Sequence, residues 1–328
     1  MNATHVSATD VSAIEMREYR TPLPNAGLNV YVRNKRKAGA SFGPDRTLLM
    51  VHGATYPASV VFDLPVDGAS WMDRLAQAGF DVWVMDLPGY GRSDRPLEMD
   101  GPADAAGPVI TTDTAILAVA AVVEFIRAKN GIEKLNLLGW SWGTAIMAGY
   151  TQDHAARVNR LALFAPLWLI KGAPSIGAPS ATLGAWRSVT KDEARLRWLG
   201  GAPEDARADL IPPGVFDAFW DAAQATDATG AAMDPPVLRA PNGVLHDIGR
   251  YWLKDAPTWD PARIECPVLI VMGEWDVDTP PSMANRIFPL LTRAKEKRLV
   301  LLGRGTHTMA LETGRHALIA EVERFLKA

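Results

Sequence analysis

The chain has 328 residues, long enough for a large buried core and for one catalytic domain with an insertion. Hydrophobic residues make up 48% and charged residues 22%, a composition that excludes an intrinsically disordered chain. The formal net charge is only −3, so neither nucleic acid nor an anionic membrane is expected as a partner.

Three features of the chain concern its cellular compartment. The first ten residues are polar and lack the apolar core of a secretory signal. No stretch is long and apolar enough to predict a membrane span. The single cysteine, Cys266, cannot form an internal disulfide, and the apolar run after it predicts a buried, inert thiol. Together these features predict a cytoplasmic protein.

Short apolar runs alternate with helical patterns, which is typical of an α/β protein with a mostly parallel sheet flanked by helices. Two early segments alternate polar and apolar residues and predict an antiparallel edge hairpin; the later ones are rich in Val, Ile and Leu, as in strands covered on both faces. The hairpin covers residues 14–20 and 28–35, and the later strands cover 47–51, 80–86, 135–138, 161–164, 268–272 and 298–302. Residues 111–130 predict a helix capped by Thr111 or Thr112 and ended by Gly131.

The alternation of strand and helix patterns is interrupted at residues 167–263. They contain no strong strand pattern, but short amphipathic pieces and six of the eleven tryptophans. So long a stretch cannot be a structureless loop inside a compact domain. We therefore expect an α/β core formed by residues 1–166 and 264–328, with residues 167–263 inserted as a helical cap.

A Gly-x-Ser-x-Gly pattern lies between a predicted strand and a predicted helix, with Ser141 at its centre. This context is the one that a nucleophile elbow requires. Gly139 and Gly143 would let neighbouring backbone come close to a strained turn, and the new helix would direct its positive N-terminal end toward the serine. The pattern predicts that Ser141 is a catalytic nucleophile.

A serine hydroxyl needs a general base near neutral pH. Of the six histidines, His307 follows the last predicted strand in a Gly-rich loop, at the sheet edge where ligands bind in open α/β folds. Surface positions explain His5, His154 and His316. We predict that His307 is the base.

The base needs an acceptor that holds its tautomer. The segment after the penultimate strand offers Glu274, Asp276 and Asp278. Asp276, at the turn after the strand end, is the preferred residue, and Asp278 is its competitor. The chain order Ser, Asp, His is the one expected for this type of fold.

The oxyanion of a tetrahedral intermediate needs backbone donors. The loop that follows strand 47–51 begins with His52 and Gly53, and we assign one donor to the Ala54 amide and the other to the Trp142 amide. His52 is expected to brace this loop. Side chains expected to contact the substrate are Thr55, Tyr56, Trp140, Trp168 and His246.

With these landmarks in order, the chain resembles the α/β-hydrolase family, in the subgroup that carries a cap after the sixth strand. The resemblance runs from about Leu28 to the C-terminus and includes His52-Gly53, the Gly-rich turn of residues 86–93, the Ser141 elbow and the Asp276/His307 pair. It implies a Ser-His-Asp hydrolase that needs no cofactor. One fold hosts many reactions, so the match predicts mechanism better than substrate.

Branches of the family differ at particular residues. Epoxide hydrolases and haloalkane dehalogenases use an aspartate nucleophile, and Ser141 argues against both. Proline iminopeptidases are similar around Trp142, and the cap offers Asp217, Asp221 and Asp247 as acids for a free amino terminus. Lactonases and carbon–carbon bond hydrolases share the same triad.

The tryptophan-rich cap favours a small to medium, apolar carboxylic ester as substrate. The alternatives are a proline iminopeptidase-like amide hydrolase, a lactonase or carbon–carbon bond hydrolase with the same triad, and a non-catalytic ligand receptor on this scaffold. No metal-binding or phosphate-binding motif is present, so neither metal nor cofactor is expected. Exposed apolar cap surface could support a homodimer.

Overall fold

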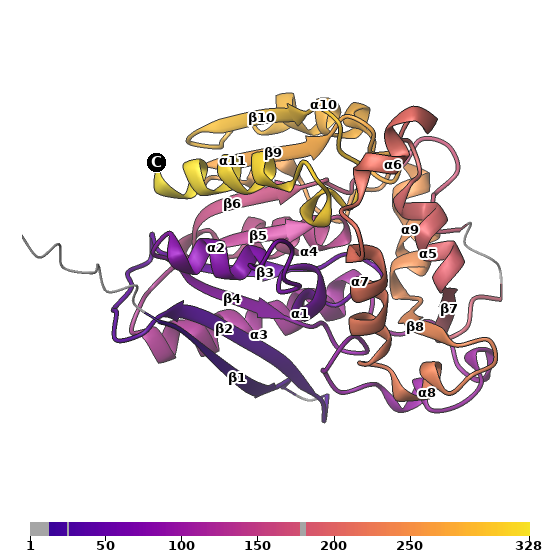
Figure 1. The fold of residues 1–328 in the computed structure, drawn as a ribbon. Coiled ribbons are helices and arrows are strands. Elements are labelled where there is room, and N and C mark those ends of the chain that lie inside the picture. The colour runs from indigo at the N-terminus through magenta and orange to yellow at the C-terminus, as the bar shows by residue number, and fades with distance from the viewer. Residues whose placement is uncertain (1–12, 25, 178–181) are drawn as a thin grey trace, which may run out of the picture.

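The computed structural model describes residues 13–24, 26–177 and 182–328. The polar first ten residues and His5 lie outside the described residues. Eight strands form one sheet in the order β1-β2-β4-β3-β5-β6-β9-β10 (Figure 1). Their bounds are β1 Ile14–Pro22, β2 Asn29–Lys37, β3 Thr47–Val51, β4 Asp81–Met85, β5 Leu135–Trp140, β6 Val158–Phe164, β9 Val268–Gly273 and β10 Lys297–Leu302.

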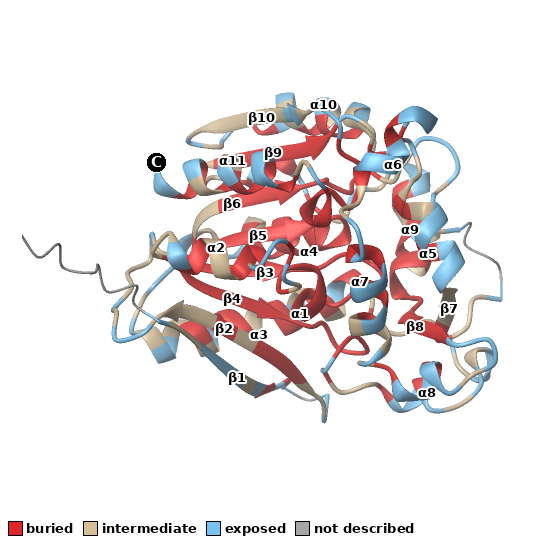
Figure 2. Ribbon diagram, viewed as in Figure 1, coloured by how far each residue is buried: buried red, intermediate tan, exposed pale blue. Residues whose placement is uncertain are grey.

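The sheet is mostly parallel. β1 pairs antiparallel with β2, and β2 pairs antiparallel with β4, whereas every pairing from β4 through β3, β5, β6 and β9 to β10 is parallel. All eight strands coincide with predicted ones, with ends that differ by a few residues at most. The central strands β3, β4, β5 and β9 are buried along their whole length, as Figure 2 shows. This burial is what their continuous Val, Leu and Ile runs predicted.

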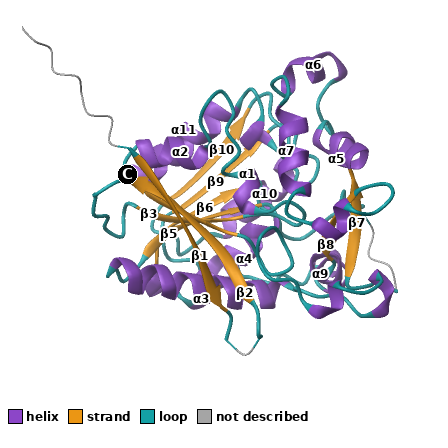
Figure 3. Cartoon of the chain, turned by 60° about the horizontal axis from the view of Figure 1, so that its bottom comes forward, coloured by secondary structure: helices purple, strands orange, loops and turns teal. Residues whose placement is uncertain are grey.

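Helices cover both faces of this sheet (Figure 3). One hydrophobic cluster joins the sheet to α3, α4 and α10, and a second joins the opposite face to α1, α2 and α11. The core helices are α1 Ala58–Val61, α2 Trp71–Gln77, α3 Thr112–Asn130, α4 Trp142–Asp153, α10 Pro281–Leu290 and α11 Arg315–Lys327. The predicted class, a mostly parallel sheet flanked by helices, is confirmed.

The helix α3 begins and ends where its sequence predicted. The Thr111 side chain accepts a hydrogen bond from the Thr114 amide, and Gly131 ends the helix with φ 65°. Cys266 is likewise buried as expected, and burial raises the pKa of its thiol to about 12.

We call residues 167–263 the insertion, because they lie in the chain between the neighbouring strands β6 and β9. They contain α5 Lys191–Trp198, α6 Arg207–Leu210, α7 Val215–Gln224, α8 Ala228–Ala231 and α9 Gly243–Arg250. In Figure 1 these elements lie beyond the arrowheads of β3 and β5. That the insertion is a separate cap domain stays a prediction.

The insertion also differs from the expectation that it has no strong strand. β7, Trp186–Thr190, pairs antiparallel with β8, Val237–Pro241. These strands are short, carry Arg187 and Arg239, and lie about 50 residues apart, so neither shows an uninterrupted apolar run. None of the helices in the described ranges is long and apolar enough to cross a membrane.

Candidate active site

Ser141 lies on a sharp turn between β5 and α4. Its backbone has φ 57° and ψ −122°, a conformation that is costly for a residue with a side chain. The turn can form because glycines stand on either side of it. A Cβ at Gly139 would lie 2.3 Å from the Gly143 carbonyl oxygen, and one at Gly143 would lie 2.5 Å from the Val51 carbonyl oxygen. The geometry is that of a nucleophile elbow.

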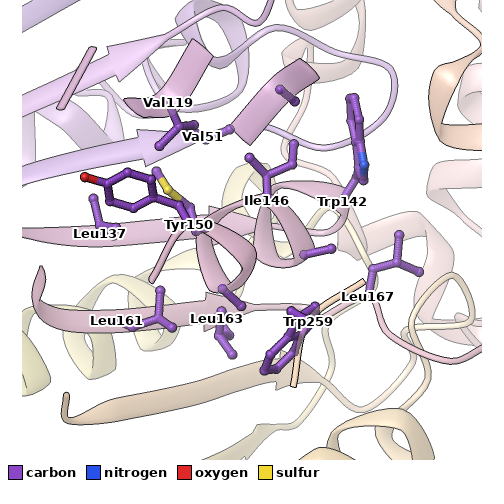
Figure 4. Close-up of a cluster of buried hydrophobic side chains, with 14 of the residues drawn as sticks. Val51, Val119, Leu137, Trp142, Ile146, Tyr150, Leu161, Leu163, Leu167 and Trp259 are labelled. Atoms are coloured by element: carbon purple, nitrogen blue, oxygen red, sulfur yellow. The ribbon is translucent and has the colours of Figure 1, made fainter. Parts of the chain in front are cut away.

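The side chain of the next residue, Trp142, turns away from this site. Figure 4 shows its ring in the buried cluster that includes Ile146 and Val51. Its indole N–H donates to Thr112 Oγ1 at 2.9 Å. Trp142 begins α4, so its own amide has no acceptor within the helix and is free to serve an oxyanion.

His307 and Asp276 are hydrogen-bonded at the carboxyl ends of β10 and β9. The distance from His307 Nδ1 to Asp276 Oδ2 is 2.9 Å. Thr279 fixes the acid by donating its amide to Asp276 Oδ1 at 2.8 Å and its hydroxyl to Asp276 Oδ2 at 3.0 Å. Trp140, next to Ser141, donates its indole N–H to the His307 carbonyl oxygen at 2.9 Å. Asp276 therefore holds the ring of His307, and Trp140 holds its backbone.

A second acid, Asp278, lies on the other side of the imidazole. Its Oδ2 is 3.7 Å from His307 Nε2 and accepts from Arg197 Nε at 2.7 Å. Burial opposes ionisation of Asp278, but Arg197 and then His307 outweigh it, and they lower the pKa of Asp278 to about 2. Burial lowers the pKa of His307, yet Asp276 and Asp278 together raise it above its ordinary 6.5. Asp276 therefore holds Nδ1 of the ring, whereas Asp278 lies nearer Nε2.

The loop after β3 lies against the elbow. A Cβ at Gly53 would be 2.9 Å from Ser141 Cβ, so the Ala54 amide follows a residue in direct contact with the serine. His52 braces this loop: its Nδ1 lies 2.7 Å from the Gly53 carbonyl oxygen, and its Nε2 accepts from the Leu87 amide at 3.0 Å. Burial lowers the pKa of His52 to about 4, which keeps the ring neutral.

Two cavities open beside Ser141. The smaller, of about 20 Å³, is lined by Ser141, His307, Ala54, Thr55, Tyr56 and Trp140, together with Arg197 and Asp278. The larger, of about 80 Å³, shares Ser141, Ala54, Arg197 and Asp278 and extends between apolar residues of the insertion and α10. Of the residues predicted to contact the substrate, Thr55, Tyr56 and Trp140 line the smaller cavity. Trp168, packed on Trp259, and His246 line neither.

The acids considered for binding a free amino terminus lie elsewhere. Asp217 pairs with the exposed Lys191, Asp221 is exposed, and Asp247 accepts from the Thr112 amide at 2.6 Å. None of the three lines the cavities at Ser141. Across residues 13–24, 26–177 and 182–328, no group of three or more His, Cys, Asp or Glu side chains is arranged to hold a metal ion.

Three residues of the site were not predicted from the sequence. Thr279 fixes Asp276, and Arg187 and Arg197 reach the site from the insertion. Arg187 donates to the Ala54 carbonyl oxygen at 2.6 Å, so the insertion contacts the predicted oxyanion loop directly. The position of Thr279, three residues after Asp276, is a sequence signal that could have predicted its contact with the acid. The sequence around Arg187 and Arg197 contains no such signal.

The sheet order and the elbow define the class of this protein, and comparisons agree with them. A family model described as the alpha/beta hydrolase fold matches residues 46–189. The structure of E-2-(acetamidomethylene)succinate hydrolase is similar over 96% of this chain and 100% of that chain, with a TM-score of 0.64 and 16% identity. The chain therefore has the α/β-hydrolase fold.

Curated relatives match over shorter stretches. Abhydrolase domain-containing protein abhd-5.2 of Caenorhabditis elegans is 33% identical over 116 residues, which are 34% of this chain and 24% of that protein. Lipase member M of Homo sapiens is 30% identical over 141 residues, 41% of this chain and 32% of that protein. The chain thus spans less than two thirds of the length of these relatives. The fold and the similarity to these relatives support a hydrolase as the class of this protein.

Proposed function

We propose that the protein is a serine hydrolase that cleaves a small to medium carboxylic ester through an acyl-enzyme, with Ser141, His307 and Asp276 as its triad. One observation carries the proposal. Ser141, on a strained elbow, lines the same small cavity as His307, whose far ring nitrogen is 2.9 Å from the buried Asp276 carboxylate.

The reaction follows from these groups. His307 takes the proton of Ser141 as the hydroxyl attacks the ester carbonyl carbon. The amides of Ala54 and Trp142 hold the oxyanion, and His307 then protonates the leaving alkoxide. Water, deprotonated by the same imidazole, attacks the acyl-enzyme; the bond from the acyl carbon to Ser141 Oγ then breaks, His307 returns the proton to this oxygen, and the acid is released. Asp276 orients the imidazole and stabilises the imidazolium that forms.

The cavities support a substrate of modest size. The smaller cavity has room for little more than one water molecule, so an ester bound at Ser141 would extend into the larger one. Leu167, Ile170 and Met283 line that larger space and favour an apolar portion in the substrate.

Replacing Ser141 tests the proposal. The Ser141→Ala protein is expected to lose p-nitrophenyl butyrate turnover by about 10⁴-fold or more, because the alanine cannot form the acyl-enzyme. Ser41→Ala, at an exposed serine in the loop before β3, is the matched control and should keep full activity. Near-full turnover by a folded Ser141→Ala protein would refute the proposal.

The alternative of an amide hydrolase is tested in the same preparation. We expect no turnover of proline p-nitroanilide, since none of the acids considered for an amino terminus lines the cavities. Turnover of the anilide that exceeds ester turnover would favour an aminopeptidase instead.

A further inference from the structure

Two arginine side chains of the insertion converge on one hydroxyl beside the proposed nucleophile. Arg187 Nη2, from β7, donates to Thr55 Oγ1 at 3.2 Å, and Arg197 Nη1, from α5, donates to the same oxygen at 3.3 Å. Thr55 and Arg197 line the small cavity together with Ser141. Arg187 lines neither cavity at Ser141; with Thr55 and Arg197 it lines an adjoining hollow of about 270 Å³. The two guanidinium groups therefore meet where this hollow borders the small cavity, at Thr55.

The positive charge of this cluster is only partly compensated. Arg197 forms an ion pair with Asp278 at 2.6 Å. Arg187 donates to the carbonyl oxygens of Pro241 and Ala54, each at 2.6 Å, but within the described ranges no carboxylate lies at ion-pair distance from it. Burial, and then the neighbouring Arg197, lower the pKa of Arg187. Thr55, Arg187, Arg197 and Asp278 together carry one net positive charge.

The hydroxyl of Thr55 can still donate one hydrogen bond. A hydroxyl oxygen has two lone pairs and one proton. Since the two arginines occupy both lone pairs, the proton must point away from them, toward another acceptor. Arg187 is half-buried. A cation that has lost part of its water and has no anion beside it is costly, so an acceptor that carries negative charge would be the most favourable partner here.

We propose that Thr55, Arg187 and Arg197 form an anion subsite that binds a carboxylate of the substrate. Guanidinium groups present planar pairs of N–H donors that match the two oxygens of a carboxylate. The substrate class is then an ester whose acyl or alcohol part ends in a carboxylate, such as the half-ester of a dicarboxylic acid. The subsite itself is independent of the proposed reaction; only the ester at its other end rests on that proposed function.

Binding to the inactive protein tests the subsite without catalysis. Glutarate is titrated calorimetrically into the Ser141→Ala protein, with glutaramide as its uncharged counterpart. We expect glutarate to bind at least about tenfold more tightly than glutaramide, and the additional Arg187→Gln change to weaken glutarate binding at least about tenfold. Arg195→Gln, at an exposed arginine of the same helix as Arg197, is the matched control and should leave binding unchanged.

Several outcomes would overturn the subsite. They are equal binding of glutarate and glutaramide, glutarate binding that is unaffected by Arg187→Gln, and tighter binding of inorganic phosphate than of glutarate. Arg187 also holds the carbonyls of Ala54 and Pro241, so its variant could unfold. In that case Thr55→Val, which keeps every charge and removes the hydroxyl that both arginines contact, should still weaken glutarate binding several-fold, and unchanged binding would equally refute the subsite.

Kinetics separate this inference from the proposed function. The unchanged enzyme should hydrolyse monomethyl glutarate with a higher kcat/KM than dimethyl glutarate. If glutarate binds as predicted but neither ester is cleaved, the subsite stands and the proposed ester hydrolysis fails. If both esters are cleaved without preference and glutarate does not bind, the hydrolase stands and the subsite fails.

Discussion

Asp276 and Asp278 both face His307, and their contacts give them different tasks. Asp276 Oδ2 is 2.9 Å from Nδ1, whereas Asp278 Oδ2 is 3.7 Å from Nε2 and is held by Arg197. We expect Asp276→Asn to lower kcat/KM by about 10³- to 10⁴-fold, because the amide no longer fixes the reactive tautomer. Asp278→Asn should cost less than about tenfold. The two variants, assayed on one ester, form a matched pair; equal losses would contradict the assignment.

The pH dependence of kcat/KM gives a second test of how Asp276 and Asp278 act on His307. A general base works only when neutral, so kcat/KM falls as the pH drops through the pKa of His307. That pKa is raised above 6.5 by Asp276 and then Asp278. Asp278→Asn removes one of these charges and should move the acid limb of the profile to lower pH.

Candidate site residues could be proposed from the sequence where a motif surrounds them and not elsewhere. Ser141 was proposed from the glycines around it, and His307 from its position after the last strand. Arg187 and Arg197 were missed because an arginine in an amphipathic segment gives the same pattern whether it faces solvent or a cavity. Only the tertiary placement of β7 and α5 brings the two together at Thr55.

At the scale of elements, the junction of β5 with α4 depends on close backbone packing. Gly143 lies against β3: an added Cβ would be 2.5 Å from the Val51 carbonyl oxygen and 2.6 Å from that of His52. Neither backbone oxygen can move without shifting the strand. Gly143→Ala is therefore expected to lower the free energy of unfolding by about 3 kcal/mol, as overpacking does in tight cores, and to reduce ester turnover.

Chemical denaturation measures that change. Gly107→Ala is the matched control, because an added Cβ there would meet no atom within 4 Å and the backbone is not left-handed. Its free energy of unfolding should stay within about 0.5 kcal/mol of the unchanged protein. If both variants were equally stable, the elbow would not need glycine at position 143.

The elements also show where a sequence pattern suffices. The buried strands were predictable because a strand covered on both faces needs an unbroken apolar run, and few other structures do. β7 and β8 were missed because they pair only with each other across about 50 residues and carry arginines that bind backbone carbonyls. Their pairing is determined by tertiary contacts and leaves no recognisable pattern in the local sequence.

At the scale of the whole molecule, one buried acid links the insertion to the loop of the proposed base. Glu312 is fully buried, and its carboxylate accepts from the Thr306 amide and from Trp198 Nε1, each at 3.0 Å. Trp198 belongs to α5 of the insertion, and Thr306 precedes His307. No cation pairs with this carboxylate in the described part of the chain. The orientation of the insertion could not be predicted from sequence, since such contacts join residues more than a hundred positions apart.

Glu312 should make the stability of the molecule depend on pH. Burial raises the pKa of Glu312 from 4.5 to about 7, although its hydrogen bonds oppose this. The folded state therefore holds the proton more tightly than the unfolded chain. The stabilising contribution is fully present below pH 4.5 and is lost as the pH rises to about 7, because the carboxylate then ionises in the interior. Between these values the loss amounts to at most about 3 kcal/mol.

The variant Glu312→Gln removes the titration and keeps the side chain's size. Free energies of unfolding are measured by denaturation from pH 4.5 to pH 8 for both proteins, and the difference between them is compared at each pH, which cancels the other titrating groups. Relative to Glu312→Gln, the unchanged protein should lose stability as the pH rises to about 7 and change little beyond it. Glu98→Gln, at an exposed acid, should give a constant difference. A constant difference for Glu312→Gln as well would mean that ionisation of Glu312 does not weaken the contact between insertion and core.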